Sequence, residues 1–371
     1  MLLILLFFII YFLFIIWLVQ GAKKINKSNE SHNSKIFLSI VVAVKNESKN
    51  LPLLINALDK QSLSKDKFEI IIINDHSNDE TLNILNKFKN KISNLKFYNS
   101  DVIPVNWDRK MWALSKGIEF SKGEVILHTD GDCIPEFTWA QKILENFSDP
   151  KVGVVCGSTP LIGESFWGKI LEIENFAQEA FGGMAVGHNF FFTCNGRSLA
   201  YRKKYFDSVG GYDRISKIIG GDDDLLIHKI IYEKNCKISF LIDDNTRVLS
   251  KCPQDTNSFI NQRLRYASKV LSYYKLRFVS NELKLIMPFL FTINLLTCYS
   301  FIRLSYSGSI LLICFILIKI ISDYLLLYFF RLKVSQKIDL YHYLILSFIH
   351  PFYIIIFSIF GPILRIHWKE N

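Results

Sequence analysis

The sequence predicts an α/β domain with a doubly wound sheet, flanked by transmembrane helices. Three observations lead to this prediction. Apolar residues form 50% of the 371 residues, and they crowd into about the first twenty and the last ninety positions. Between these ends, short apolar runs alternate with helical patterns. Carboxylates follow several of the runs, at the sheet edge where folds of this kind bind ligands.

The N-terminal apolar run is long enough to cross a membrane. Residues 2–19 carry no charge. A helix of this length spans roughly 27 Å, close to the thickness of a bilayer core. No basic region precedes the run and no A-x-A-like site follows it, so we expect an anchor over residues 1–20 rather than a cleaved signal peptide. Residues 21–35 are polar and basic and are expected to form a linker.

Three more apolar segments, at residues 283–302, 310–330 and 343–364, predict a C-terminal membrane region over residues 283–364. Prolines interrupt this region. All three segments can cross the membrane, or one of them can be a re-entrant hairpin or a helix that lies along the interface. The number of crossings and the side of the C-terminus stay open. Lys319 and Asp323 lie four residues apart in the third segment, and we expect them to form an ion pair.

Basic residues flank the apolar segments. Lys23, Lys24 and Lys27 follow the first one, and the loop at residues 331–337 is also basic, which predicts that both lie in the cytoplasm. We therefore expect a multi-pass protein of the cytoplasmic (inner) membrane, within the cell envelope, whose catalytic domain faces the cytoplasm. The net charge of +10 fits anionic lipid headgroups better than nucleic acid. The seven cysteines show no C-x-x-C spacing, which argues against zinc and against a disulfide framework.

The region at residues 36–275 is large enough for one catalytic domain. Continuous Val/Ile runs bounded by turn residues are typical of strands covered on both faces, and their alternation with helices predicts a parallel sheet. The predicted strands cover residues 38–44, 69–75, 96–99, 124–130 and 152–157.

Acidic residues follow three of these strands. Glu47, Asp75, Asp130 and Asp132 should gather at the carboxyl edge of the sheet, where their charges would repel one another unless a cation neutralised them. Oxygen ligands suit Mg²⁺, and Asp130 and Asp132, two residues apart, can point the same way. The alternative is that Asp130 and Asp132 are ordinary turn residues. We expect a site for Mg²⁺ or Mn²⁺ held by Asp132, with Asp130.

Residues 37–269 resemble the membrane-attached family 2 glycosyltransferases, which have the GT-A fold. The resemblance is carried by four stretches, "SIVVAVKNESKNLPLLINAL", "EIIIINDHSNDET", "DRKMWALSKGIEFSKGEVILHTDGDCIP" and "CNGRSLAYRKKYFDSVGGYD". It implies that a nucleotide-diphosphate sugar binds at this edge, with uridine as the first guess for the nucleoside. It also implies metal binding by Asp130 and Asp132. The implied nucleotide-binding residues are Ala43, Glu47, Asp75, Lys110 and Asp130.

A later stretch resembles the segment in which a Glu-Asp pair supplies the general base of the family. In "IGGDDDLLIHKI", Gly221 stands where Glu is usual if Asp222 is the base, and a shift by one residue makes Asp222 and Asp223 the pair. Either acid is therefore a candidate. Without the other motifs, the acids would simply favour the N-terminus of the following helix.

The stretch "QRLRY" resembles the Q-x-x-R-W motif of processive synthases, with Tyr266 in place of Trp. The resemblance implies contacts with the diphosphate or the acceptor by Gln262, Arg263, Arg265 and Tyr266. The change from Trp to Tyr leaves processivity open. Arginines beside a membrane segment also commonly face lipid or solvent.

The predicted function is an inverting, metal-dependent hexosyl transfer from a nucleotide sugar to a hydroxyl of a lipid or lipid-linked acceptor at the cytoplasmic face. One alternative is a processive polysaccharide synthase. A second is a sugar-phosphate nucleotidyltransferase, although "VAVKNESKN" lacks the glycines of a phosphate loop. A third is a non-enzymatic membrane scaffold. The sugar, the acceptor, the pathway and the oligomeric state are not encoded in any motif that we recognise.

Overall fold

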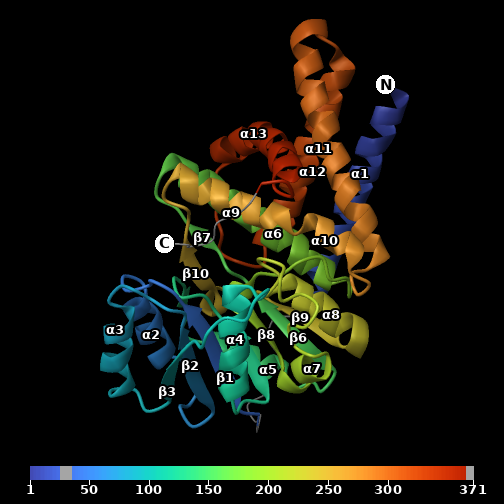
Figure 1. Cartoon of the computed structure of the whole chain (residues 1–371). Coiled ribbons are helices and arrows are strands. Elements are labelled where there is room, and N and C mark those ends of the chain that lie inside the picture. The colour runs from blue at the N-terminus through green and yellow to red at the C-terminus, as the bar shows by residue number, and fades with distance from the viewer. Residues whose placement is uncertain (26–35, 365–371) are drawn as a thin grey trace. The chain divides into compact units, whose positions relative to one another are not determined.

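The computed structural model describes residues 1–25 and 36–364 (Figure 1). Most of the predicted linker, at residues 26–35, and the C-terminal residues 365–371 lie outside the described residues. The chain divides into two compact units. The sheet unit comprises Ile25–Pro160 and Thr193–Lys251, and the membrane unit comprises Met1–Lys24, Leu161–Phe192 and Cys252–Asn371.

The sheet unit contains a seven-stranded sheet with the strand order β3-β2-β1-β4-β8-β6-β9. Strands β2, β1 and β4 are parallel, and their register places Leu38 opposite both Phe68 and Val125. The bounds are β1 (Leu38–Val44), β2 (Phe68–Asn74), β3 (Leu95–Asn99), β4 (Val125–His128), β6 (Val152–Gly157), β8 (Leu199–Arg202) and β9 (Lys237–Leu241).

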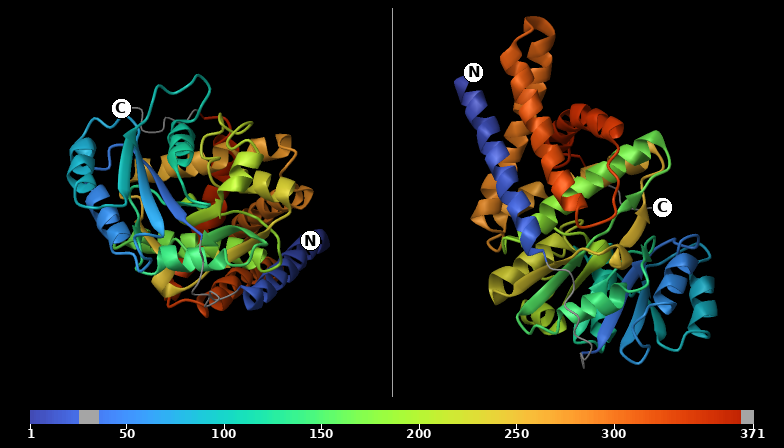
Figure 2. Two further views of the ribbon diagram at one scale, coloured as in Figure 1. Left: turned by 90° about the horizontal axis from the view of Figure 1, so that it is seen from below. Right: turned by 180° about the vertical axis from the view of Figure 1, so that it is seen from behind.

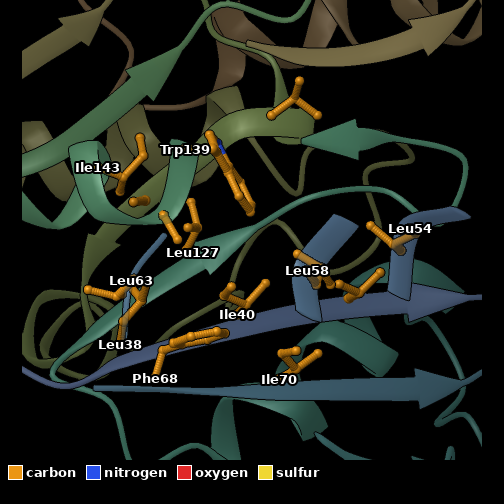
Figure 3. Packing of buried hydrophobic residues seen from close by; sticks show 14 of the residues in the cluster. Leu38, Ile40, Leu54, Leu58, Leu63, Phe68, Ile70, Leu127, Trp139 and Ile143 are labelled. Carbon is orange, nitrogen blue, oxygen red and sulfur yellow. The ribbon is translucent and has the colours of Figure 1, made fainter. Parts of the chain in front are cut away.

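Helices cover both faces of this sheet. Ile40 and other even-numbered residues of β1 pack with Leu54 of α2 and Trp139 of α5 in one hydrophobic core (Figure 3). On the other face, α4 comes so close that a Cβ on Gly117 would lie 2.4 Å from the Val41 side chain. Even- and odd-numbered residues of β1 face opposite sides because side chains alternate along a strand, and helices on both sides confirm the doubly wound prediction. The helices are α2 (Leu51–Asp59), α3 (Thr81–Lys89), α4 (Arg109–Phe120), α5 (Trp139–Asn146), α7 (Lys203–Ser208) and α8 (Asp224–Lys234).

The sheet departs from a purely parallel arrangement at β8, which is antiparallel to both β4 and β6. The alternation of strands and helices did not predict this strand. The chain leaves the sheet unit after Pro160 and returns at Thr193, so β8 enters after a long excursion rather than after a short helical crossover. The remaining elements are β5 (Ile134–Pro135), β7 (Leu161–Ile162), β10 (Val248–Lys251) and the 3₁₀ turns Ala22–Lys24, Gly196–Ser198 and Asp244–Thr246.

Among the described residues, the membrane unit contains four helices that are long and apolar enough to cross a membrane. Helix α1 packs along α12, and α11 contacts both α12 and α13 (Figure 2). Lys319 pairs with Asp323 as expected, and Tyr11 of α1 donates a hydrogen bond to the same carboxylate. The bounds are α1 (Leu2–Gly21), α6 (Phe166–Val186), α9 (Thr256–Ser268), α10 (Val270–Lys275), α11 (Asn281–Ser307), α12 (Ile310–Arg331) and α13 (Leu340–Phe360).

Candidate active site

The loops that follow β1 and β2 are tied to one another at the carboxyl edge of the sheet. The Asp75 amide donates to the Val44 carbonyl at 2.8 Å, which carries the pairing of β1 and β2 one residue past the end of β2. In the β1 loop, the Glu47 amide donates to Thr81 Oγ1 at 2.9 Å. These bonds satisfy backbone donors that the end of each strand leaves free, and they hold Glu47 and Asp75 on the same edge.

Lys110 joins two of the predicted site residues. Its Nζ lies 2.9 Å from Asp130 Oδ1 and 2.9 Å from Asp222 Oδ2. Lys110 stands in the first turn of α4, whose N-terminus is capped by Asp108. Burial alone would lower the pKa of Lys110, but the two carboxylates outweigh burial and raise it well above its ordinary value. The side chain is therefore an ammonium that neutralises part of the acidic cluster.

A small pocket surrounds this ammonium. Of the described residues, its lining includes Asp130 and Asp222 but not Asp75 or Asp132. Asp222 is buried, with 8% exposure, whereas Asp132 is exposed beside Asp130. Asp75, Asp130, Asp132 and Asp222 therefore lie at one edge of the sheet, but they do not all line this pocket. The lining comprises Lys110, Leu114, His128, Thr129, Asp130, Gly196, Leu199 and Asp222.

Asp222 and Asp223 have different surroundings. Asp223 is the N-cap of α8, because its side chain accepts from the Asp224 amide at 2.7 Å and from the Gly196 amide at 3.1 Å. Asp222 instead turns its carboxylate to Lys110 in the pocket. Of the two candidates for the base, Asp222 is the one that lines the pocket.

Asp130 and Asp132 form an acidic pair together with Cys133. One ligand atom from each residue lies within 4.8 Å of the other two. The Asp132 side chain is exposed, but the protein around its carboxylate removes part of the surrounding water and so raises its pKa, and the negative charges of Asp130 and Glu47 add to this shift. Burial also raises the pKa of the Cys133 thiol, so the sulfur stays protonated and is a poor ligand. Two crowded carboxylates are the donor set that Mg²⁺ or Mn²⁺ prefers, and the residues fit such an ion.

Asp75 is buried and paired at the same edge. Arg109 approaches it with two nitrogens, Nε at 3.3 Å from Oδ2 and Nη2 at 3.4 Å from Oδ1. His76 Nδ1 lies 2.9 Å from Oδ1. Sequence reasoning missed Arg109 and His76, although Arg109 directly precedes Lys110. Ala43 lies in β1 opposite Ile73, one residue before the end of the strand.

His128, at the end of β4, forms a wall of the pocket. Its Nδ1 lies 3.1 Å from the Val41 carbonyl and its Nε2 lies 2.7 Å from the Tyr201 hydroxyl. Nδ1 therefore donates to Val41 and Nε2 accepts from Tyr201. Burial lowers the pKa of His128 to about 4, so the imidazole is neutral at pH 7. A neutral ring leaves Lys110 as the cation that faces both Asp130 and Asp222.

The residues of "QRLRY" lie on α9, in the membrane unit. Arg263 is 7% exposed, and its Nη2 donates to Glu174 Oε2 of α6 at 2.6 Å. Its guanidinium also lies 5.1 Å from the Phe259 ring centroid. Arg263 is thus tied to another helix of its own unit. The expected contacts of Gln262, Arg263, Arg265 and Tyr266 with diphosphate or acceptor stay a prediction.

A mixed sheet covered on both faces, with acidic loops and Lys110 at its carboxyl edge, is compatible with the GT-A fold of nucleotide-diphospho-sugar transferases. Residues 39–210 match the family described as "Glycosyl transferase family 2". Residues 39–210 are therefore similar to glycosyltransferase family 2.

Parts of the chain are similar in sequence to known glycosyltransferases. The chain is 30% identical over 122 residues to "Glycosyltransferase AglE" of Haloferax volcanii. The aligned region covers 33% of this chain and 39% of that protein. It is 27% identical over 271 residues to "Probable glycosyltransferase YdaM" of Bacillus subtilis. This aligned region covers 71% of this chain and 62% of that protein. The chain therefore spans less than two thirds of either relative.

A solved structure shares the fold. The mannosyltransferase PcManGT from Pyrobaculum calidifontis, in complex with GDP-Man and Mn²⁺, superposes with a TM-score of 0.59 at 14% identity. The superposition covers 93% of this chain and 96% of that chain. At this identity, the similarity establishes the fold and no more.

Proposed function

We propose that this protein is an inverting glycosyltransferase, which moves a sugar from a nucleotide-diphosphate donor to a hydroxyl of a lipid or lipid-linked acceptor. The observation that carries the proposal is the position of Lys110 between Asp130 and Asp222. One ammonium bridges a carboxylate of the candidate cation pair and the carboxylate of the candidate base. Both are needed within a few ångströms of the bond that breaks in a sugar transfer.

The donor binds with its nucleoside toward Asp75 and its phosphates toward Lys110. Asp75 is an acceptor for a base N–H, and Arg109 and His76 hold its carboxylate in place. Ala43 in β1 and Glu47 in the loop that follows it are proposed to contact the nucleotide. Uridine is the first candidate because of the family resemblance, and guanosine is the second because a protein of the same fold binds GDP-Man.

Asp132, with Asp130, would hold Mg²⁺ or Mn²⁺ next to the diphosphate. When bound, such an ion neutralises the negative charge that grows on the departing diphosphate. Mn²⁺ accompanies the nucleotide sugar in the solved structure that shares the fold. Lys110 contributes a second positive charge on the same side of the scissile bond.

Asp222 is the proposed general base. The acceptor hydroxyl gives its proton to Asp222 while its oxygen bonds to the anomeric carbon, and the bond from that carbon to the diphosphate oxygen breaks. Attack from the face opposite the leaving group inverts the anomeric centre. Because a positioned base contributes about 10² to 10⁴ in rate, this one carboxylate accounts for a large part of the expected acceleration.

A membrane acceptor explains the four apolar helices. An enzyme whose acceptor lies in the bilayer gains local concentration from being held there, whereas a soluble acceptor offers no such gain. We propose that the sheet unit works on the cytoplasmic side, because basic residues such as Lys23 and Lys24 beside an apolar segment favour that side. Gln262, Arg263, Arg265 and Tyr266 of α9 are proposed to serve the diphosphate or acceptor side.

Membranes that contain the protein would be incubated with a panel of radiolabelled UDP- and GDP-sugars and then extracted with organic solvent. We expect label from one donor to enter the lipid fraction, and Asp132→Asn and Asp222→Asn to abolish it. Label found only in water-soluble product would contradict the lipid acceptor. A product of many sugar units would instead favour a processive synthase.

A further inference from the structure

Lys229 is a buried cation that the proposed reaction does not use. It stands on α8 and is 1% exposed. Its Nζ donates to the Gly211 carbonyl at 2.9 Å and to the Asp213 carbonyl at 2.8 Å. Among the described residues, no carboxylate lies within ion-pair distance of this nitrogen. A buried ammonium without a paired carboxylate is costly, so its place calls for a specific reason.

The two carbonyls belong to the start of the loop that carries Asp222. The chain turns at Gly210 and Gly211, with φ of 72° and 51°, and Arg214 also has a positive φ of 71°. A Cβ on Gly211 would lie 2.8 Å from the Phe206 ring. Glycine adopts such φ values readily, but the backbone at Arg214 needs support from its surroundings, because residues other than glycine rarely adopt them. Lys229 supplies that support through its two hydrogen bonds.

The same loop is fastened at two further points. At its middle, the Ser216 carbonyl accepts from the Asp108 amide at 2.6 Å, and Asp108 is the N-cap of α4. At its end, Asp222 pairs with Lys110 in the first turn of α4. The loop is therefore held to α8 at its start and to α4 at its middle and end. Of these three contacts, that between Asp222 and Lys110 lies in the pocket, and the Lys229 contacts involve no residue of the pocket lining.

We infer that Lys229 is a positioning residue, which fixes the loop at residues 211–222 so that Asp222 meets the acceptor hydroxyl. This inference rests on the proposed function. The groups proposed to face the nucleoside, Asp75 and Arg109, lie on other segments, and their pairing with each other involves no residue of the loop. Loss of Lys229 should therefore reduce turnover and leave nucleotide binding unchanged. A misplacement of about 1 Å at a reacting group typically costs about 10² in rate.

The test uses the protein in reconstituted membranes and compares Lys229→Met with Lys234→Met, a matched lysine on the same helix. Trypsin reports on the loop directly, because Arg214 and Lys217 are exposed within it. We expect Lys229→Met to be cut faster after Arg214 and Lys217, to lose about 10² in kcat, and to bind nucleotide as the wild type does. Lys234→Met should match the wild type in all three measurements.

Two results would overturn the inference. One is a Lys229→Met protein with unchanged tryptic cleavage of the loop. The other is a fall in nucleotide affinity as large as the fall in kcat, because a general structural defect would cause that pattern. If Lys229→Met does not fold, Lys229→Gln keeps one donor and is compared in the same way. A wild-type protein without sugar transfer would instead contradict the proposed function, and the tryptic comparison tells the two failures apart.

Discussion

The Nζ of Lys110 lies 2.9 Å from Asp222 Oδ2, and the same nitrogen lies 2.9 Å from Asp130 Oδ1. The side chain of Lys110 thus links Asp222, the proposed general base, to Asp130, one of the two carboxylates proposed to hold the cation. Asp222 and Asp130 lie on separate loops and carry like charges, so they would repel each other without the ammonium. We expect this ion-pair triad to hold the ligand-free site together and to loosen when a donor and a cation arrive.

Asp222→Asn should lower sugar transfer by about 10² to 10⁴, because the acceptor hydroxyl loses its proton acceptor. Nucleotide binding should not change. Asp223→Ala should behave differently, since Asp223 caps α8 and its loss costs about 1 kcal/mol of stability. Steady-state kinetics and thermal unfolding of both variants separate the two roles. If Asp223→Ala lost more activity than Asp222→Asn, the base would be Asp223.

Lys110→Met should destabilise the metal-free protein on the order of 2 kcal/mol, because two carboxylates lose a charged hydrogen-bond donor. A divalent cation can replace part of the lost positive charge. Mn²⁺ should therefore raise the unfolding temperature of Lys110→Met more than that of the wild type. Thermal unfolding in detergent, with and without Mn²⁺, measures both effects. Equal stabilisation of the two proteins by Mn²⁺ would count against a cation beside Lys110.

Asp132→Asn should stabilise the protein when no metal is present. The pKa of Asp132 is raised above its ordinary value of 3.8, so the folded state holds this proton more tightly than the unfolded state does. Stability is then fully present below pH 3.8 and falls as the pH rises through the raised pKa. In EDTA, the variant should melt above the wild type at pH 7, and the gap should close toward pH 3.8.

Added Mn²⁺ supplies the control for this variant. A ligand at 100 times its Kd adds about 2.7 kcal/mol to the stability of the state that binds it. The wild type should gain this stabilisation at pH 7 and Asp132→Asn should lose most of it, which reverses their order of melting. An unchanged response to Mn²⁺ in the variant would remove Asp132 from the metal site.

In the membrane unit, Tyr11→Phe should weaken the packing of α1 on α12, because Asp323 loses a hydrogen-bond donor. Interhelical hydrogen bonds in membranes contribute about 0.6 kcal/mol on average, so the effect should be small. Asp323→Asn should cost more, since it leaves the buried Lys319 without its counter-ion. Unfolding in mixed detergent measures both, with Tyr306→Phe, at an 82% exposed position, as the control. Equal stability of Asp323→Asn and the control would contradict a stabilising ion pair.

The sequence predicted the parallel half of the sheet closely, because buried parallel strands read as continuous apolar runs. Strand β1 begins and ends at the residues where its run begins and ends. Strand β6, which lies on the other side of β8, also begins and ends with its run. It did not predict β8 as an antiparallel strand between β4 and β6, because short-range periodicity carries no information on strand order. The pairing of Arg109 with Asp75, 34 residues away, depends on loop conformation and was missed for the same reason.

The roles of Asp222 and Asp223 show the same limit. Three consecutive acids before an apolar helix are compatible with a base or with a cap. The structure shows that Asp223 is the cap, whereas the base role of Asp222 stays a proposal. Only the fold decides which acid turns toward Lys110. The packing of α6 against α12 and α13 likewise depends on contacts that are remote in sequence.

Calorimetric titration of the purified protein with UDP and with GDP, in Mn²⁺ and in EDTA, tests most directly whether the acidic edge of the sheet holds a cation and a nucleotide diphosphate together. We predict that one of the two nucleotides binds in Mn²⁺ and not in EDTA, and that Asp132→Asn abolishes this binding. Binding that persists in EDTA and in Asp132→Asn, or no binding of either nucleotide, would contradict the proposal.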